Sequence, residues 1–167
     1  INKITPEQKA ALKLDSLHAD SIGKTNAAGN FAKAASIPEQ LVTVENNLIK
    51  AVFTTKGGAV KYIELKQYNS QTGGKVVLEE SDKDGFSYAI NTGANKSAST
   101  SEMDFVAEKP VTNADGSQTV QFKLMDSAGA GIIHQYTIKK DSYLIDWDIS
   151  LAGAQSLITN NILNFHF

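Results

Sequence analysis

The chain has 167 residues, enough for one domain with a hydrophobic core, and its 41% hydrophobic and 20% charged residues are an ordinary globular balance. It has no cysteine, which excludes disulfides, cysteine zinc sites and thiol catalysis. The net charge is −2, and all 16 basic residues are Lys without a basic cluster, so specific nucleic-acid binding is not expected.

Residues 1–40 differ in composition from the rest and are expected to form a helical tether and a linker. Thr5 can cap a helix, Pro6 suits its first position, and apolar residues recur at helical spacing as far as Ile22. Residues 23–36 are small and polar, with Phe31 their only bulky side chain, which favours a flexible linker or a frayed helical extension. No apolar run approaches the roughly 20 residues of a membrane span, so we expect a soluble chain whose targeting or anchoring segment lies outside it.

From Leu41 onward the pattern predicts strands that alternate with turns. The first strands are expected at residues 41–45, 48–55 and 59–66. Gly57-Gly58 permits the positive φ of a two-residue hairpin or a bulge, and we expect this hairpin to set strand register and to carry no chemistry. The next expected elements are strands at 76–78 and 86–91, a mobile loop at 91–101 and an edge strand at 103–107.

The later part of the chain gives the clearest strand signals. Residues 119–125 and 132–139 predict a hairpin, and residues 157–167 predict a last apolar strand. Between them one face of a strand carries Tyr143, Ile145, Trp147, Ile149 and Leu151, and the other carries Leu144, Asp146, Asp148 and Ser150. This period of two predicts one buried and one solvated face. The spacing of the strands, without helical crossovers, predicts an all-β antiparallel sandwich at residues 41–167.

Candidate chemical groups are few, and a structural reading is favoured for each. His18, His134 and His166 are far apart in sequence, and each is expected to be a packed or solvated side chain and not a metal ligand. Asp146 and Asp148 would stand about 7 Å apart on one strand, a spacing open to a glycosidase-like pair or a calcium site, although a solvated face is favoured. No cofactor or metal is expected.

Aromatic side chains offer a second kind of candidate site. Tyr62, Tyr68 and Trp147 could line a cleft for a sugar or a peptide, whereas aromatics in a sandwich more often belong to its core. Together with His134, Asp146 and Asp148, the two tyrosines form our set of expected cleft or partner-binding residues.

Three short triplets follow the acceptor pattern of some bacterial periplasmic O-glycosylation systems. Each has Asp, then Ser, then an apolar residue, and they are Asp15-Ser16-Leu17, Asp20-Ser21-Ile22 and Asp126-Ser127-Ala128. A covalent glycan on the native protein is therefore a hypothesis that an intact mass would test.

The stretch LVTVENNLIKAVFTTKGGAVKYIELKQY resembles the opening of one known domain family. The matching residues are Val42, Val44, Asn46, Leu48, Thr54, Gly57, Gly58, Ala59, Val60, Leu65 and Tyr68. Residues 86–88 and 122–151 resemble later strands of the same family, which is the large periplasmic domain of the YidC membrane protein insertases. The resemblance covers most of residues 41–152.

The resemblance implies a β-supersandwich like that of galactose mutarotase, on the periplasmic face of the inner membrane of a Gram-negative cell. It implies a non-catalytic interaction domain whose parent protein inserts and folds inner-membrane proteins, alone or with Sec translocon subunits of the SecDF or SecYEG type. Partners would then be translocon subunits and nascent membrane proteins, and membrane tethering would come from segments outside this chain.

The chain is also shorter than the family domain, so the supersandwich is expected to be incomplete. Residues 157–167 would then form an unpaired apolar edge, and we hypothesise that a second copy or a missing segment covers it by dimerisation or strand exchange. Two other classes stay open. One is a periplasmic carbohydrate-binding or mutarotase-like protein, for which His134 with Asp146 or Asp148 is the only acid–base pair to nominate. The other is a secreted structural or adhesin module.

Overall fold

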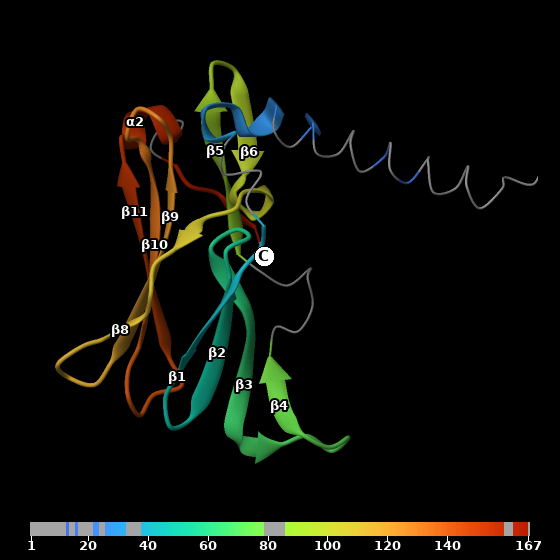
Figure 1. Ribbon diagram of the computed structural model, residues 1–167, viewed down its shortest axis with the longest axis vertical. Coiled ribbons are helices and arrows are strands. Elements are labelled where there is room, and N and C mark those ends of the chain that lie inside the picture. Colours follow the sequence, from blue (N-terminus) through green and yellow to red (C-terminus); the bar gives the residue numbers. More distant parts are fainter. Residues whose placement is uncertain are drawn as a thin grey trace, which may run out of the picture.

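The computed structural model describes residues 13, 16, 22–23, 26–32, 38–78, 86–158 and 162–166, and it is built almost entirely of antiparallel strands (Figure 1). The elements in chain order are η1 (Gly29–Phe31), β1 (Leu41–Glu45), β2 (Ile49–Thr54), β3 (Ala59–Asn69), β4 (Lys75–Leu78), β5 (Ser87–Gly93), β6 (Lys96–Ser99), η3 (Thr100–Glu102), β7 (Val106–Ala107), β8 (Val111–Thr112), β9 (Gln118–Met125), β10 (Gly131–Ile138), β11 (Ile145–Ala152), α2 (Ala154–Leu157) and β12 (Phe165–His166).

The first sheet joins four strands in the order β1-β2-β3-β4. An irregularity between Val52 and Phe53 shifts the register, so that Val52 faces Tyr62 whereas Phe53 faces Val60. Lys61 is thereby the extra residue of a β-bulge. The bulge keeps Val60 opposite the fully buried Phe53, so the apolar face of β3 continues past the irregularity.

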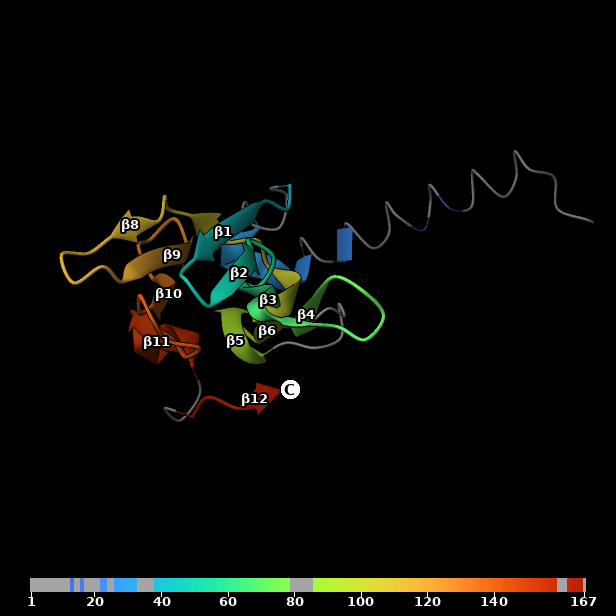
Figure 2. The ribbon, with the colours of Figure 1, turned by 90° about the horizontal axis from the view of Figure 1, so that it is seen from below.

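The second sheet has the order β11-β10-β9-β7, and β8 also pairs with β9. Strand β10 pairs along its whole length with β9 on one side and β11 on the other, without a register shift. A smaller third sheet has the order β12-β5-β6. Figure 2 shows the first two sheets as separate layers, with β5, β6 and β12 beside them.

The core lies where these sheets meet. The ring of Phe53 on β2 stands 5.8 Å from that of Phe122 on β9 and 4.8 Å from that of Tyr136 on β10, measured between centroids. Tyr88 and Ile90 bring β5 into the same cluster of buried side chains. Apolar residues at alternate positions of every long strand therefore meet in one continuous core, as expected for a sandwich.

The Gly57-Gly58 turn is buried and joined to a distant part of the chain. The Gly57 amide donates to the carbonyl of Met103 at 2.7 Å, and the Phe105 amide donates to the carbonyl of Thr55 at 2.7 Å. Gly58 has φ of +57°, and a Cβ atom there would lie 2.9 Å from Cγ of Phe105. Only glycine fits this combination of backbone conformation and close packing.

The described part of the segment at residues 23–36 is helical and contributes to the core, so of our two alternatives the flexible linker was wrong there and the helical extension fits. Ala28 and Phe31 are each only 2% exposed, and both belong to the core cluster. The Thr92 hydroxyl of β5 donates to the carbonyl of Ala27, and Gly29 packs against the backbone of Thr92. Most of the expected helix at residues 6–22, including His18, lies outside the described residues, and the boundary at residue 40 stays a prediction.

Two further expectations were wrong. Residues 91–101 are not a mobile loop, because β6 and η3 occupy most of that stretch and Thr100 is buried. Residues 157–167 are not one unpaired strand. Leu157 ends α2 and is buried, while β12 pairs with β5 through Phe165 and Tyr88.

Other expectations were confirmed. The all-β antiparallel fold, the strand at residues 41–45 and the late hairpin of β9 and β10 are present. The alternation on β11 is also present, since Ile145, Trp147, Ile149 and Leu151 are partly buried and pack on the core. The likeness to galactose mutarotase stays a prediction.

Candidate functional site

A buried hydrogen-bonded network links three separate parts of the chain at the carbonyl oxygen of Gly58. His134 Nδ1 lies 2.9 Å from this oxygen, and the Tyr136 hydroxyl donates to it at 2.9 Å. Because a carbonyl oxygen only accepts, Nδ1 of His134 must carry the proton. Nε2 is then the acceptor of the hydrogen bond from the Tyr88 hydroxyl, at 2.7 Å.

Burial holds two side chains of this network, His134 and Tyr88, in their neutral forms. Burial lowers the pKa of His134 to about 4, against a weaker opposing effect of its hydrogen bond to Gly58. Burial also raises the pKa of Tyr88. His134 is 2% exposed and Tyr88 is 0% exposed, so the network fixes the meeting point of the sheets and is not open to a substrate.

An apolar groove of about 360 Å³ lies beside this network, between β3 and the end of the second sheet. Its walls are mostly aliphatic and aromatic, formed by Ala59, Val60, Ile63, Phe86, Tyr136, Tyr143, Leu144, Ile145 and Trp147. The indole of Trp147 stacks on Tyr136 at 5.8 Å and 6°. Its Nε1 atom is buried without a hydrogen-bond partner among the residues that the structure describes.

The groove has an exposed rim. Leu144 is 72% exposed and Tyr143 is 42% exposed, although both are apolar or aromatic. Tyr68 contacts Tyr143, with ring centroids 6.3 Å apart, so it borders the groove without lining it. Exposed apolar side chains beside a groove are typical of a surface that another chain covers.

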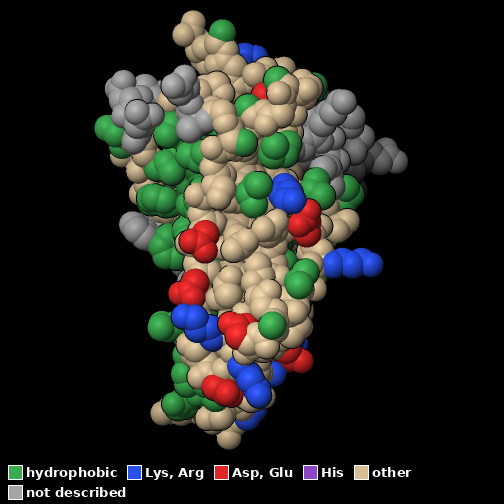
Figure 3. Space-filling model, turned by 90° about the vertical axis from the view of Figure 1, so that its left-hand side faces the viewer, with side chains coloured by type: hydrophobic (Ala, Val, Ile, Leu, Met, Phe, Trp, Pro, Cys, Tyr) green, Lys and Arg blue, Asp and Glu red, His purple; other side chains and the backbone are tan. Residues whose placement is uncertain are grey.

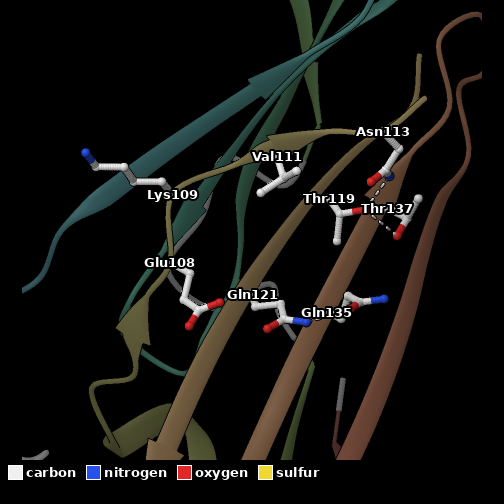
Figure 4. Close-up of a pocket in the computed structure, with 8 residues that line it drawn as sticks. All are labelled: Glu108, Lys109, Val111, Asn113, Thr119, Gln121, Gln135 and Thr137. Atoms are coloured by element: carbon white, nitrogen blue, oxygen red, sulfur yellow. Dashed lines mark hydrogen bonds between the residues drawn. The ribbon is translucent and has the colours of Figure 1, made fainter. Parts of the chain in front are cut away.

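A polar pocket of about 480 Å³ lies on the outer face of the second sheet (Figure 4). Amide and hydroxyl groups line it, and many bond to each other across strands: Gln121 donates to Gln135 at 2.7 Å, and Asn113 donates to the Thr119 hydroxyl at 2.9 Å. Glu108, Lys109, Val111 and Thr137 complete its walls. Figure 3, which shows the molecule from the left-hand side of Figure 1, has Lys and Asp or Glu side chains scattered over its middle and lower parts and hydrophobic side chains gathered along one edge.

The structure does not bring our expected site residues together. His134 points into the core, whereas Asp146 and Asp148 are exposed on the opposite face of the neighbouring strand, across from Thr137 and Gln135. Lys139 forms an ion pair with Asp146 at 3.4 Å. The nominated acid–base pair of His134 with either aspartate therefore has no common pocket.

The two expected tyrosines also lie apart. Tyr62 sits opposite Val52, on the face of β3 that alternates with the inward Ile63. Tyr68 is 53% exposed near the end of β3. That any of these residues binds a partner stays a prediction.

Sequence reasoning missed Tyr88 as the partner of His134. The two residues are 46 positions apart, and no local pattern connects them. Alternation along β10 did place His134 on the same face as Ile132, Tyr136 and Ile138, which the burial of these four residues confirms. A polar residue on such an apolar face indicates a buried partner, because an unpaired polar group in a core is costly.

Two negative findings apply to the described ranges alone. No group of three or more His, Asp or Glu side chains there is arranged to hold a metal ion. Nor does the same part of the chain contain a helix with the length and hydropathy that crossing a bilayer requires.

Fold and surface together define a class: an antiparallel β-sandwich domain with a sealed polar network and open apolar and polar surfaces. The sequence-family model described as the YidC periplasmic domain matches residues 41–161, and the chain belongs to this family.

Named relatives support the assignment. The membrane protein insertase YidC of Phocaeicola vulgatus is 34% identical over 84% of this chain and 21% of its own length. Those of Parabacteroides distasonis and Chlorobaculum parvum are 27% and 30% identical, over 91% and 80% of this chain and 24% of their own lengths. The chain thus spans about a fifth to a quarter of these relatives. No solved structure matches it significantly.

Proposed function

We propose that this chain is a non-catalytic interaction domain on the periplasmic face of the inner membrane of a Gram-negative bacterium. Its parent protein inserts and folds inner-membrane proteins, alone or together with the Sec translocon. Membership of the YidC periplasmic domain family and relatives that carry the name membrane protein insertase support this role. The domain's part is to receive an extended segment of a translocon subunit or of a nascent membrane protein.

The observation that carries this proposal is the free side of β11. Among the described residues β11 pairs with β10 alone, through eight consecutive residues without a bulge. A long, regular edge strand presents unpaired backbone groups and can accept a further strand. The edges of the first sheet are less suitable, since β1 has five residues and β4 has four with a register shift.

The side chains of β11 indicate what kind of strand would fit. Trp147 and Ile149 face the core, so an added strand would extend the apolar layer with apolar residues of its own. Asp146 and Asp148 face outward and would lie beside the partner's outward side chains. Because opposite charges stabilise cross-strand pairs, the best partner alternates apolar residues with lysine, arginine or neutral polar residues.

A second copy of the same strand fits less well. An antiparallel pair of β11 strands centred on Asp148 would place two aspartates directly opposite each other, and such like-charge pairs are destabilising. The apolar groove lies on the core-facing side of β11, which contributes Ile145 and Trp147 to its walls, and exposed Leu144 lies at its rim. An incoming segment could therefore gain backbone hydrogen bonds at β11 and apolar contacts in the groove.

Site-specific photo-crosslinking in the full-length membrane protein tests the proposal. A photoreactive amino acid replaces Asp148 or Leu144, and Gln71 in the exposed turn between β3 and β4 serves as the control position. We expect adducts with a translocon subunit or a nascent inner-membrane protein from the first two positions and none from the third. Equal adducts from all three positions, or none from any, would contradict the proposal, and an adduct with a second copy would establish a homodimer instead.

A second candidate function, periplasmic carbohydrate binding, is favoured by the polar pocket alone. Its facing amides and hydroxyls are groups that hydrogen-bond to sugar hydroxyls, and Gln121 and Gln135 form its floor (Figure 4). A thermal-shift screen with neutral sugars would support this function if a stabilising sugar lost its effect in Gln121→Ala. The absence of any stabilising sugar would leave only the interaction role.

A further inference from the structure

The turn between β9 and β10 carries an exposed serine at its tip. Asp126 organises the turn, because its Oδ1 atom accepts hydrogen bonds from the amides of Ala128 at 2.8 Å and Ala130 at 2.9 Å. The Asp126 amide in turn donates to the carbonyl of Ala130 at 2.8 Å. Ser127 lies at the exposed tip of this turn, and its hydroxyl has no hydrogen-bond partner within the described ranges.

Several other serines near chain reversals are engaged through their hydroxyls. Ser99 and Ser101 hydrogen-bond to each other at 2.7 Å, and the Ser156 hydroxyl donates to the carbonyl of Gly153 at 2.8 Å. The closest comparison is Ser142, which also follows an aspartate. Its hydroxyl accepts a hydrogen bond from the Leu144 amide at 3.0 Å, so Ser142 itself organises its turn. In the β9–β10 turn Asp126 accepts the turn hydrogen bonds instead, and Ser127 does not.

The position of Ser127 suits covalent attachment of a bulky group. Figure 1 shows the β9–β10 turn projecting at the end of the second sheet, beside α2. The turn is held by Asp126 and by glycine at position 129, so its shape does not depend on the serine side chain. A substituent on the Ser127 oxygen would extend into solvent without breaking a hydrogen bond of the fold.

We propose that Ser127 is the acceptor of an O-linked glycan. It is the central residue of the Asp126-Ser127-Ala128 triplet, and its side chain is exposed at the tip of an ordered turn. In the reaction the Ser127 oxygen bonds to the anomeric carbon of a glycan activated as a lipid-linked diphosphate. The bond from that carbon to the diphosphate oxygen breaks, the diphosphate leaves with the electron pair, and a base of the transferase takes the hydroxyl proton.

The distribution of lysines makes the test clean. Cleavage after lysine releases residues 124–139, in which Ser127 is the only serine and Thr137 the only threonine. Ser142 falls in a different fragment, which begins at residue 141, and the two other triplets fall together in residues 14–24. A mass increase on residues 124–139 therefore reports on Ser127 once fragmentation has excluded Thr137.

The experiment isolates the full-length protein from its native host and maps these fragments by mass spectrometry. We expect residues 124–139 to carry an added mass equal to a set of sugar residues, and Ser127→Ala to abolish it. Ser142→Ala is the matched control and should leave the added mass unchanged. Asp126→Asn keeps an oxygen that can hold the turn but removes the charge, so it should lower glycan occupancy at least tenfold while the melting temperature stays near wild type.

An unmodified fragment 124–139 from the native host would overturn the proposal. So would a glycan confined to residues 14–24, or an added mass that persists in Ser127→Ala. Protein made in the cytosol of a host without such a transferase supplies the unmodified reference mass for the same fragment.

Discussion

Replacing Gly58 by alanine tests whether the buried turn is the point at which the sheets are fitted together. The new Cβ would stand 2.9 Å from Cγ of Phe105 and 3.0 Å from Cβ of Phe122, closer than such atoms approach. A left-handed backbone costs a non-glycine residue about 1–2 kcal/mol. Overpacking of a core costs about 1–3 kcal/mol more. We therefore expect Gly58→Ala to lower the free energy of unfolding by about 2–5 kcal/mol.

Gly74→Ala is the matched control. Gly74 also has a positive φ, +76°, but a Cβ there would meet nothing within 4 Å. It should cost only the backbone part, about 1–2 kcal/mol. Urea denaturation followed by the fluorescence of Trp147, the single tryptophan, measures both variants. Equal losses in Gly58→Ala and Gly74→Ala would refute the view that close packing at Gly58 matters.

The remaining predictions concern the buried network and the N-terminal segment. Because the folded-state pKa of His134 is about 4 and the unfolded value about 6.5, the unfolded state binds the proton first as pH falls. The free energy of unfolding should therefore drop by about 3 kcal/mol between pH 6.5 and 4. In His134→Gln, urea denaturation over the same pH range should give a flatter profile, and a profile equal to wild type would contradict this. Tyr88→Phe leaves Nε2 of His134 without a donor and should cost about 1–3 kcal/mol in the same assay, whereas a neutral effect would argue against a buried hydrogen bond between these two side chains. Phe31→Ala should cost about 3–5 kcal/mol, against about 0.5 kcal/mol or less for the exposed Ile22→Ala, and similar small losses would mean that the segment does not pack on the core.

Much of the sheet architecture could be predicted from the sequence because it depends on local alternation. On β11 every second residue from Ile145 to Leu151 is apolar, and these are the residues that pack on the core. On β10 the same period placed His134 inside. A strand with one solvated and one buried face alternates polar and apolar residues, so its own sequence predicts which residues are buried.

The wrong expectations concern segments whose environment is set by distant residues. Residues 26–32 are small and polar apart from Phe31, and only the surface of β5, about 60 positions later, gives that side chain a place in the core. Strand β6 is rich in serine and has little β-propensity of its own, so its pairing with β5 decides its structure.

The candidate site was the least predictable part. The hydrogen bonds of Gly58 with His134 and Tyr136 span 76 and 78 positions, and the apolar groove combines residues from β3, the residue before β5, and β10, β11 and the connection between them. Assembly of this kind is decided by how sheets pack, which periodicity within one strand does not encode.

The order of the strands along the chain also constrains how the protein is made. The first sheet is complete at Leu78, but Phe122 and Tyr136, which cover Phe53, follow about 40 to 60 residues later. At about 5–20 residues per second, synthesis leaves the apolar face of that sheet uncovered for about 2–12 s. During this interval the exposed apolar face of β2 and β3 favours aggregation. A ribosome pause before residue 136 would therefore prolong the stage of synthesis at which the chain aggregates most readily.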